Sequence, residues 1–447
     1  MKKLTSLVLV LSMVLVSLAG CGGGGETIET TATQTTTAKA TEADTTKEAE
    51  AEAVTLTWAL WDWEATTYYE PLIDAYIAEN PHVTIEYLDL GSADYQTMLS
   101  AQLSGGADDI DIITVKDIPG YSTMVNAGQL ETLNDRISAA GIDTSAYGGT
   151  TEQITIDNSL YALPFRSDFW VMYYNKDLFD AADVAYPSND MTFEEYDALA
   201  RKMTSGEGID KVYGAHYHTW RSAVQLFGIL DGKNTIVDGS YDFLAPYYEL
   251  ILNQQKDGVV MDYATLKTSS THYSGVFYNN QVAMMNMGSW FIATLISKIE
   301  AGETDVKNFG IVKYPHAEGI APGTTLGTIT SLAVNKKSAN TDAAFDFLSF
   351  VCGEEGAEVI ANTGTIPAIK NDEVLTAISG IEGFPSDDES KEALKTAKTY
   401  LEMPVHEKSS DIEVILNLNH DEIMTENTSI EDGIATMNTD VQELLSR

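Results

Sequence analysis

Short apolar runs alternate with helical patterns in the first part of the chain. Three of the runs are typical of buried strands, at residues 54–60, 83–88 and 111–115. Between them, apolar side chains recur at helical spacing. The alternation predicts a parallel sheet that is covered by helices on both faces. Ligands of such sheets bind beyond the carboxyl ends of the strands, where this sequence places Trp61, Asp62, Asp89 and Asp117.

A longer strand is expected within residues 161–179, which read YALPFRSDFWVMYYNKDLF. Successive side chains of a strand point to opposite faces, so Arg166, Asp168 and Trp170 share one face. An ordinary half-buried strand would carry simple polar residues at these positions. We interpret the segment as the first crossing between two lobes, with this polar face exposed in the cleft between them.

The chain begins with the features of a secretory signal. Lys2 and Lys3 precede an apolar run at residues 4–18, which is too short for a comfortable membrane span. The sequence Leu18-Ala19-Gly20-Cys21 resembles the bacterial lipobox. In that family the chain is cut before the cysteine, and the cysteine thiol is lipidated. We expect residues 1–21 to be a lipoprotein signal that ends at lipidated Cys21, the alternative being an ordinary signal peptide with a chance cysteine.

Residues 22–53 differ in composition from the rest of the chain. They are rich in Thr, Ala and Glu, and Ile28 is their only large apolar residue. Such a segment cannot bury enough surface to offset its ordering entropy, so it is expected to be a disordered linker. The sequence after the signal has no apolar run long enough to span a membrane. We therefore expect the lipid to be the only anchor, at the outer face of the cell membrane.

The chain is strongly acidic and poor in cysteine. Its 67 acidic residues against 26 basic ones give a formal charge of −41, which argues against binding to nucleic acid or to anionic lipid. The same charge weakly favours neutral over acidic ligands, although Arg166 could reverse this locally. If Cys21 carries lipid, Cys352 has no disulfide partner. Cys352 follows Leu348 in an apolar helical stripe and is expected to be a small buried side chain.

The part of the chain after the linker is longer than one core usually covers, so two lobes are expected. We assign residues 54–166 and 315–366 to lobe 1, and residues 167–314 and 367–447 to lobe 2. Two further crossings between the lobes are expected at residues 310–314 and 363–368. Thr192 and Glu195 form a capping-box pattern at the start of a helix. Helical patterns are also expected at residues 391–401 and 430–445.

Several stretches carry a family resemblance. They are TWALWDW at residues 57–63, YYNKDLF at 173–179, MTFEEYDALA at 191–200, FYNNQVAMMNMGSWF at 277–291 and LAVNKKSANTDAAFDFLSF at 332–350. In this order they resemble the extracellular solute-binding proteins of ABC importers, in the sugar-binding group that includes maltose-binding protein. The resemblance implies a two-lobed periplasmic-binding-protein-like α/β fold of type II. Its doubly wound sheets would be joined by three hinge crossings and would close on a ligand.

The resemblance also implies roles for individual residues. Asp168 falls where a cleft carboxylate contacts sugar hydroxyls, and Trp290 falls where an aromatic platform stacks on a pyranose ring. Trp220 and Tyr217 fall in another aromatic wall, whereas Lys116 and Asp117 match a polar cleft position only roughly. Flat aromatic rings and planar polar groups suit the apolar face and hydroxyl rim of a sugar. The predicted ligand-binding residues are Trp61, Asp62, Asp117, Arg166, Asp168, Trp170, Tyr217, Trp220 and Trp290.

Other classes of function were weighed against this one. A surface glycoside hydrolase needs two carboxylates that flank a bond, and Asp62, Asp117 and Asp168 could be combined in that way. A phosphate-binding loop is excluded because only three residues separate Gly228 from Gly232. His216 and His218 share a strand face, but no third metal ligand is evident.

We therefore expect a monomeric, lipid-anchored and non-enzymatic binding protein without a cofactor or metal. Its expected partners are a carbohydrate and the membrane permease subunits of an ABC importer. A non-sugar small solute of the same family stays open as the ligand, as does a surface adhesin as a third class of function. The family's wall near the carboxyl terminus has no counterpart that we can place in the sequence.

Overall fold

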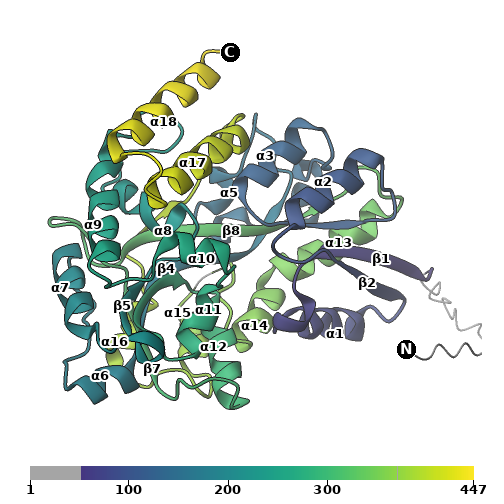
Figure 1. The fold of residues 1–447 in the computed structure, drawn as a ribbon. Coiled ribbons are helices and arrows are strands. Elements are labelled where there is room, and N and C mark those ends of the chain that lie inside the picture. The colour runs from purple at the N-terminus through teal and green to yellow at the C-terminus, as the bar shows by residue number, and fades with distance from the viewer. Residues whose placement is uncertain (1–51, 370) are drawn as a thin grey trace, which may run out of the picture. The chain divides into compact units, whose positions relative to one another are not determined.

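Nine strands form the framework of the fold in the computed structural model, which describes residues 52–369 and 371–447 (Figure 1). The strand order is β2-β1-β3-β8-β4-β6-β5, with β7 paired to β4 and β9 paired to β8. β1 pairs in parallel with β2 and β3, as the alternating pattern predicts. The strands are β1 (Val54–Leu60), β2 (Val83–Asp89), β3 (Ile112–Val115), β4 (Leu163–Asn175), β5 (Tyr213–His216), β6 (Val282–Gly288), β7 (Phe309–Lys313), β8 (Thr324–Val334) and β9 (Lys398–Leu401).

β4 is the strand on which two groups of strands meet. Its first half, through Phe169, pairs antiparallel with β8. Its second half pairs antiparallel with β6 and β7. Arg166 also forms a bridge to Pro367, which brings a later segment back to the same strand. The long strand predicted within residues 161–179 is therefore present, and it links the two groups.

The two faces of β4 point into different buried clusters, as strand alternation predicts. Phe169, Val171 and Tyr173 belong to one cluster, and Trp170, Met172 and Tyr174 belong to the other. The expectation that the polar face is exposed was wrong. Arg166 is 7% exposed, and Asp168 and Trp170 are each 1% exposed. A strand that is covered on both faces buries even its polar side chains.

The helices of the first group and their neighbours are α1 (Tyr69–Glu79), α2 (Tyr95–Gly105), α3 (Ile118–Asn126), α4 (Asn134–Ala140), α5 (Thr150–Gln153), α13 (Thr341–Cys352) and α14 (Glu354–Asn362). α13 packs against β1, β4 and β8, and α1 packs against α13 and α14. Cys352, at the end of α13, is buried, and its thiol donates to the Leu163 carbonyl. The prediction of a small buried cysteine is confirmed.

The remaining helices are α6 (Lys176–Ala182), α7 (Phe193–Met203), α8 (Ser222–Gln225), α9 (Ala245–Lys256), α10 (Tyr263–Thr268), α11 (Tyr273–Tyr278), α12 (Phe291–Glu300), α15 (Asp372–Ser379), α16 (Asp388–Ala393), α17 (Ser409–Met424) and α18 (Ile430–Leu445). Single turns of tighter helix are η1 (Trp63–Ala65), η2 (Thr144–Tyr147), η3 (Gly208–Asp210), η4 (Leu226–Ile229) and η5 (Asp242–Leu244). α17 packs between α18 and α9 and also against α3 (Figure 1). Among the described helices, none combines the length and apolar character that a membrane crossing requires.

The helix predicted at residues 391–401 was wrong in its second half. α16 ends at Ala393, and Lys398–Leu401 forms β9, which pairs in parallel with the start of β8. The pairing partner lies far away in the sequence, and local periodicity carries no information about such a contact. The helix predicted at residues 430–445 is confirmed as α18.

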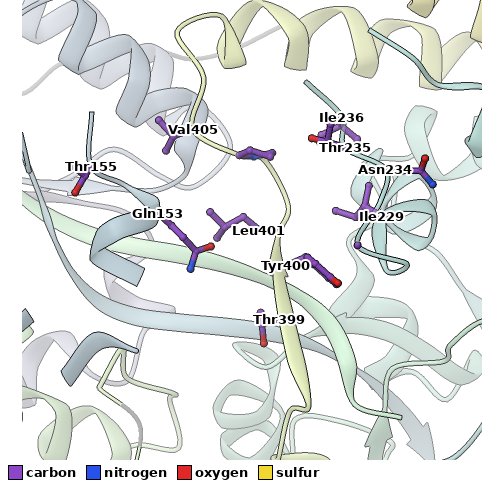
Figure 2. A pocket seen from close by; sticks show the side chains of 12 residues that line it. Gln153, Thr155, Ile229, Asn234, Thr235, Ile236, Thr399, Tyr400, Leu401 and Val405 are labelled. Atoms are coloured by element: carbon purple, nitrogen blue, oxygen red, sulfur yellow. The ribbon is translucent and has the colours of Figure 1, made fainter. Parts of the chain in front are cut away.

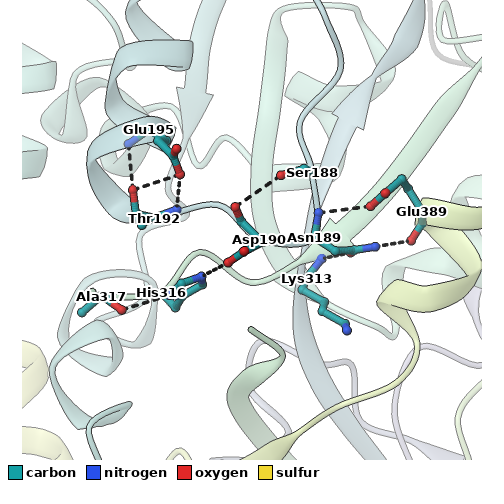
Figure 3. A network of polar contacts seen from close by, with 9 residues as sticks. All are labelled: Ser188, Asn189, Asp190, Thr192, Glu195, Lys313, His316, Ala317 and Glu389. Carbon is teal, nitrogen blue, oxygen red and sulfur yellow. Dashed lines mark hydrogen bonds and ion pairs between the residues drawn. The ribbon is translucent and has the colours of Figure 1, made fainter. Parts of the chain in front are cut away.

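α7 begins in a polar network that joins three segments of the chain (Figure 3). The Thr192 hydroxyl accepts from the Glu195 amide at 3.2 Å, and the Glu195 carboxylate accepts from the Thr192 amide at 2.9 Å. The predicted capping box is confirmed. Beside it, the Phe193 amide donates to the His316 carbonyl at 3.0 Å, and the His316 ring lies 3.0 Å from the Asp190 carboxylate.

Replacement of Thr192 by alanine is expected to lower the free energy of unfolding by about 1 kcal/mol, because the first turn of α7 loses its side-chain acceptor. Urea unfolding followed by circular dichroism measures this change. Ser188→Ala is the matched control, since Ser188 is an exposed hydroxyl in the same network whose bond to the Asp190 carbonyl is long, at 3.3 Å. Equal losses in the two variants would contradict the assigned role of the cap.

Candidate functional site

Four rings gather at the turn that follows β6, and we call them the aromatic wall: His218, Trp220, Tyr273 and Trp290. The Trp220 ring centroid lies 4.5 Å from that of His218, 5.6 Å from that of Tyr273 and 6.3 Å from that of Trp290. The Trp290 indole N–H donates to the Tyr273 hydroxyl at 3.2 Å. Trp220 is 38% exposed and Trp290 is half-buried, so the wall keeps open aromatic surface.

Gly288 determines where the Trp290 ring can lie. A Cβ atom at this position would come within 2.0 Å of the Trp290 ring, which no side chain could tolerate. β6 ends at Gly288, and Trp290 already has helical backbone angles as the residue before α12. The GSW turn therefore holds the indole flat against the backbone at the end of the strand.

On the other side of the site, Trp61 and Asp62 follow β1. The Trp61 ring packs edge-on against Tyr95, with centroids 5.0 Å apart, and the Lys116 ammonium lies 5.3 Å from the Trp61 ring centroid. The Asp62 carboxylate accepts from the Ser92 amide at 2.9 Å. Trp61 and Asp62 are both half-buried, as the prediction of a ligand site at this strand end requires.

Asp117 follows β3 and begins α3. One oxygen of its carboxylate caps the start of α3 by accepting from the Gly120 amide at 2.7 Å. The second oxygen is not part of this cap. Burial raises the pKa of Asp117, and the negative charge of Glu413 on α17 raises it further, while Gly120 and Lys116 act in the opposite direction. Asp117 is therefore a half-buried carboxylate that faces a second carboxylate from a distant part of the chain.

Arg166 and Asp168 form a buried ion pair on β4, with 2.5 Å between guanidinium and carboxylate. Arg166 also donates to the Tyr68 hydroxyl at 2.5 Å, and the Ser289 hydroxyl donates to Asp168 at 2.8 Å. The chain of contacts runs from the segment before α1, across β4, to the residue next to Trp290. The pair therefore ties the aromatic wall to the first group of strands.

Trp170 is also buried, and its indole N–H donates to the carboxylate of Glu402. Its ring packs edge-on against Trp290, with centroids 5.9 Å apart. Glu402 follows β9 and is half-buried. Burial raises the pKa of Glu402 to about 7, the Trp170 and Arg221 groups act to lower it, and the carboxylates of Glu413 and Asp117 raise it.

Several of these side chains lie close enough for the charge of one to act on the pKa of another. Burial lowers the pKa of His272, and the charge of Asp62 opposes this shift. Burial raises the pKa of Tyr273 in the aromatic wall, and the charges of Asp168 and Asp62 add to that rise. Asp117 and Glu413 act on Glu402 in the same way. We therefore treat the residues that follow β1, β3 and β9, together with the aromatic wall, as one candidate site.

The chain from residue 61 to residue 358 matches the family described as bacterial extracellular solute-binding protein. This match covers well over half of the sequence. The chain belongs to that family. A crystal structure of a sugar transporter from Rhizobium etli in an open conformation is 55% identical, has a TM-score of 0.76 and covers 87% of this chain and 99% of its own.

Two more distant relatives agree with this family. An ABC substrate-binding protein from Listeria monocytogenes, solved in complex with cycloalternan, is 20% identical with a TM-score of 0.76 over 88% of this chain and 100% of its own, and it shows the fold. The galactooligosaccharide-binding protein of Bacillus subtilis is 23% identical over 58% of this chain and 61% of its own length. The predicted two-lobed α/β fold of this solute-binding family is confirmed.

Tyr217 is the predicted site residue that lies apart from the others. It is 4% exposed, and its ring packs edge-on against Tyr196 and Phe227 at centroid distances of 6.3 Å. His218, its neighbour, lies in the aromatic wall instead, because successive side chains of an extended segment point in opposite directions. Cys21, the predicted lipidation site, lies outside the described residues.

Sequence reasoning missed four other members of the candidate site: His272, Tyr273, Glu402 and Glu413. His272 and Tyr273 begin α11, Glu402 follows β9 and Glu413 lies in the first half of α17, and the positions of these elements depend on contacts between distant segments. Only Tyr273 could have been suspected, as an aromatic residue in a polar segment at the start of α11. Within residues 52–369 and 371–447, no group of three or more His, Cys, Asp and Glu side chains is arranged to hold a metal ion.

A separate cavity of about 460 Å³ lies beside the segment that carries β9 (Figure 2). Uncharged side chains line it, among them Gln153, Asn234, Tyr400 and Leu401. None of the predicted ligand-binding residues is in its lining. A second hollow of about 410 Å³ lies between residues 184–191 and α7.

Proposed function

We propose that this solute-binding protein captures a carbohydrate, as a mono- or oligosaccharide, and delivers it to the permease of an ABC transporter. The observation that carries the proposal is the aromatic wall opposite a set of half-buried polar side chains. Trp220 and Trp290 supply flat apolar surface for the C–H face of a pyranose ring. Asp62, Asp117 and Glu402 supply acceptors for its hydroxyls.

The family and its named relatives support a sugar as the ligand. The related structure from Rhizobium etli is a sugar transporter, the Listeria protein was solved with cycloalternan, and the Bacillus relative binds galactooligosaccharides. These are binding proteins rather than enzymes. The alternative ligand is a non-sugar solute of similar size and polarity. The thermal-shift screen described below distinguishes it from a sugar.

The proposed mechanism is closure of two lobes around the ligand. We assign residues 54–166 and 315–366 to lobe 1, and residues 167–314 and 367–447 to lobe 2. Asp62 and Asp117 then belong to lobe 1, and the aromatic wall and Glu402 belong to lobe 2. A sugar that contacts both sets at once binds the closed state better than the open state, and only this difference can shift the population toward closure.

The proposed location is the outer face of the cell membrane. A lipid on Cys21 and a linker over residues 22–53 would keep the binding part close to the permease at high effective concentration. Metabolic labelling with an alkyne fatty acid tests the anchor. Label is expected on the wild-type protein and is expected to be lost in Cys21→Ala, whereas equal labelling of the two would contradict lipidation at this residue.

A thermal-shift screen against mono- and oligosaccharides tests the proposed ligand class. A ligand at 100 times its Kd adds about 2.7 kcal/mol to the stability of a protein that binds it only when folded. A rise in Tm of several degrees is therefore expected with the correct sugar. The sugar should be recovered unchanged after binding. Failure of every sugar, or hydrolysis of the bound sugar, would contradict the proposal.

A further inference from the structure

Glu402 occupies an unusual position in the site. Its backbone amide donates to the Gly327 carbonyl at 3.1 Å, which fixes it at the end of the β8–β9 pair. One carboxylate oxygen accepts the Trp170 indole N–H. Among the ion pairs between described residues, none includes Glu402, Asp117 or Asp62. The site therefore holds three carboxylates that no cation of the described chain neutralises by direct contact.

The cations near these carboxylates already have partners. Arg166 is bound by Asp168 and Tyr68, and the Arg221 guanidinium is bound by Glu413. The Lys116 ammonium donates to the Ser92 carbonyl. The charge of Arg166 is therefore already balanced by Asp168, and its two terminal nitrogens are engaged by Tyr68 and Asp168.

The Nε–H group of Arg221 is a buried donor without a hydrogen-bond partner in the described structure, as is the Nε–H group of Arg166. Arg221 is 4% exposed, and its Nε–H group makes no hydrogen bond within the described structure. A buried N–H group without an acceptor costs free energy, so a ligand oxygen there would be favourable. A hydroxyl can accept from such a donor and donate to a neighbouring carboxylate at once, whereas a carboxylate or phosphate group cannot donate.

We propose that Glu402 sets the charge specificity of the site, so that the protein binds neutral sugars and rejects acidic ones. This inference rests on the proposed function. In the bound state a sugar hydroxyl donates to Glu402, and the adjacent Arg221 Nε–H group completes the contact. At a pH above 7, where Glu402 is ionised, an acidic sugar places a negative charge beside Glu402 and Asp117, and the partly desolvated surroundings strengthen the repulsion.

Glu402→Gln tests the proposal, because the amide keeps the acceptor for Trp170 and removes the charge. Glu407→Gln is the matched control, since Glu407 is exposed five residues further along the same segment. The probes are galactose with galacturonate, glucose with glucuronate, and galactobiose with digalacturonate, measured by calorimetry at pH 8, where Glu402 is ionised. The wild-type protein and Glu407→Gln are expected to prefer the neutral member at least tenfold, and Glu402→Gln is expected to lose most of that preference.

The ligand-free protein gives a second readout that needs no sugar. Trp170 on β4 is bonded to Glu402, and the titratable groups that act on it or are acted on by it are Arg221 before α8, Glu413 on α17, Asp117 at α3 and Tyr314 after β7. Burial raises the pKa of Glu402 to about 7 from an ordinary value of 4.5, so the wild-type protein is destabilised as pH rises through this interval. Glu402→Gln is expected to have a higher Tm than the wild type at pH 8. This difference in Tm is expected to be smaller at pH 4.5, where Glu402 of the folded protein is protonated.

The outcomes separate the two proposals. A preference for the acidic sugars, or an unchanged preference in Glu402→Gln, would overturn the role of Glu402 while leaving a sugar-binding protein. A gap in Tm that does not depend on pH would also overturn it. Binding of none of these or the screened sugars would overturn the proposed function and the inference together.

Discussion

Replacement of Trp290 by alanine is expected to weaken sugar binding by about 30-fold, because removal of a central aromatic anchor costs about 2 kcal/mol or more. The ring is held in place by the absence of a side chain at Gly288 and by its hydrogen bond to Tyr273. It also contacts Trp220, the most exposed ring of the wall. Calorimetric titration of the sugar found in the screen measures the loss directly.

Two further variants show whether the loss of affinity is specific to the flat ring at position 290. Trp290→Phe keeps a flat ring and is expected to retain a large part of the affinity. Trp63→Ala is the control, because Trp63 stacks on Tyr87 at 3.9 Å, outside the aromatic wall, and its loss should leave sugar affinity unchanged. If Trp290→Ala bound the sugar as tightly as the wild type, the proposed platform would be wrong.

Replacement of Asp168 by asparagine is expected to destabilise the protein by about 3–5 kcal/mol. The change leaves the buried Arg166 guanidinium without its counter-charge, and an uncompensated buried charge is far more costly than a lost surface pair. It also weakens the link to Ser289, beside the aromatic wall. Urea unfolding at neutral pH measures the loss of stability.

The exposed pair between Arg447 and Glu443 serves as the comparison. Its side chains are 67% and 62% exposed, so Glu443→Gln is expected to change the free energy of unfolding by less than about 1 kcal/mol. If the two variants were equally stable, Arg166 and Asp168 would not form the buried pair. Sugar affinity of Asp168→Asn, measured where the variant is folded, then reports whether Asp168 also contacts the ligand.

Much of the fold could be predicted from local patterns. The run at 54–60 coincides with β1, the Thr192 capping box marks the start of α7, and the alternation along β4 separates two buried clusters. These features depend on side chains within one element. The turn at Gly288 is predictable for the same reason, because glycine followed by Ser289 and Trp290 breaks a buried strand.

The rest depends on contacts between distant segments. Nothing local to residues 398–401 indicates that they pair with β8, and Glu402 enters the site only through that pairing. Burial of Arg166 and Asp168 depends likewise on helices that cover β4 from both sides. Tyr217 and His218 could not be told apart until the direction of β5 was known. The sequence therefore predicts Trp220, Trp290 and the carboxylates that follow β1 and β3, and it misses Glu402 and Glu413, whose positions depend on distant contacts.

The most direct test of the account is the crystal structure of the protein with its sugar bound. The account predicts a pyranose ring stacked on Trp290, with Trp220 beside it and ligand hydroxyls within hydrogen-bond distance of Glu402 and Asp117. A sugar found instead in the cavity lined by Gln153, Asn234 and Tyr400, with the aromatic wall unoccupied, would contradict it.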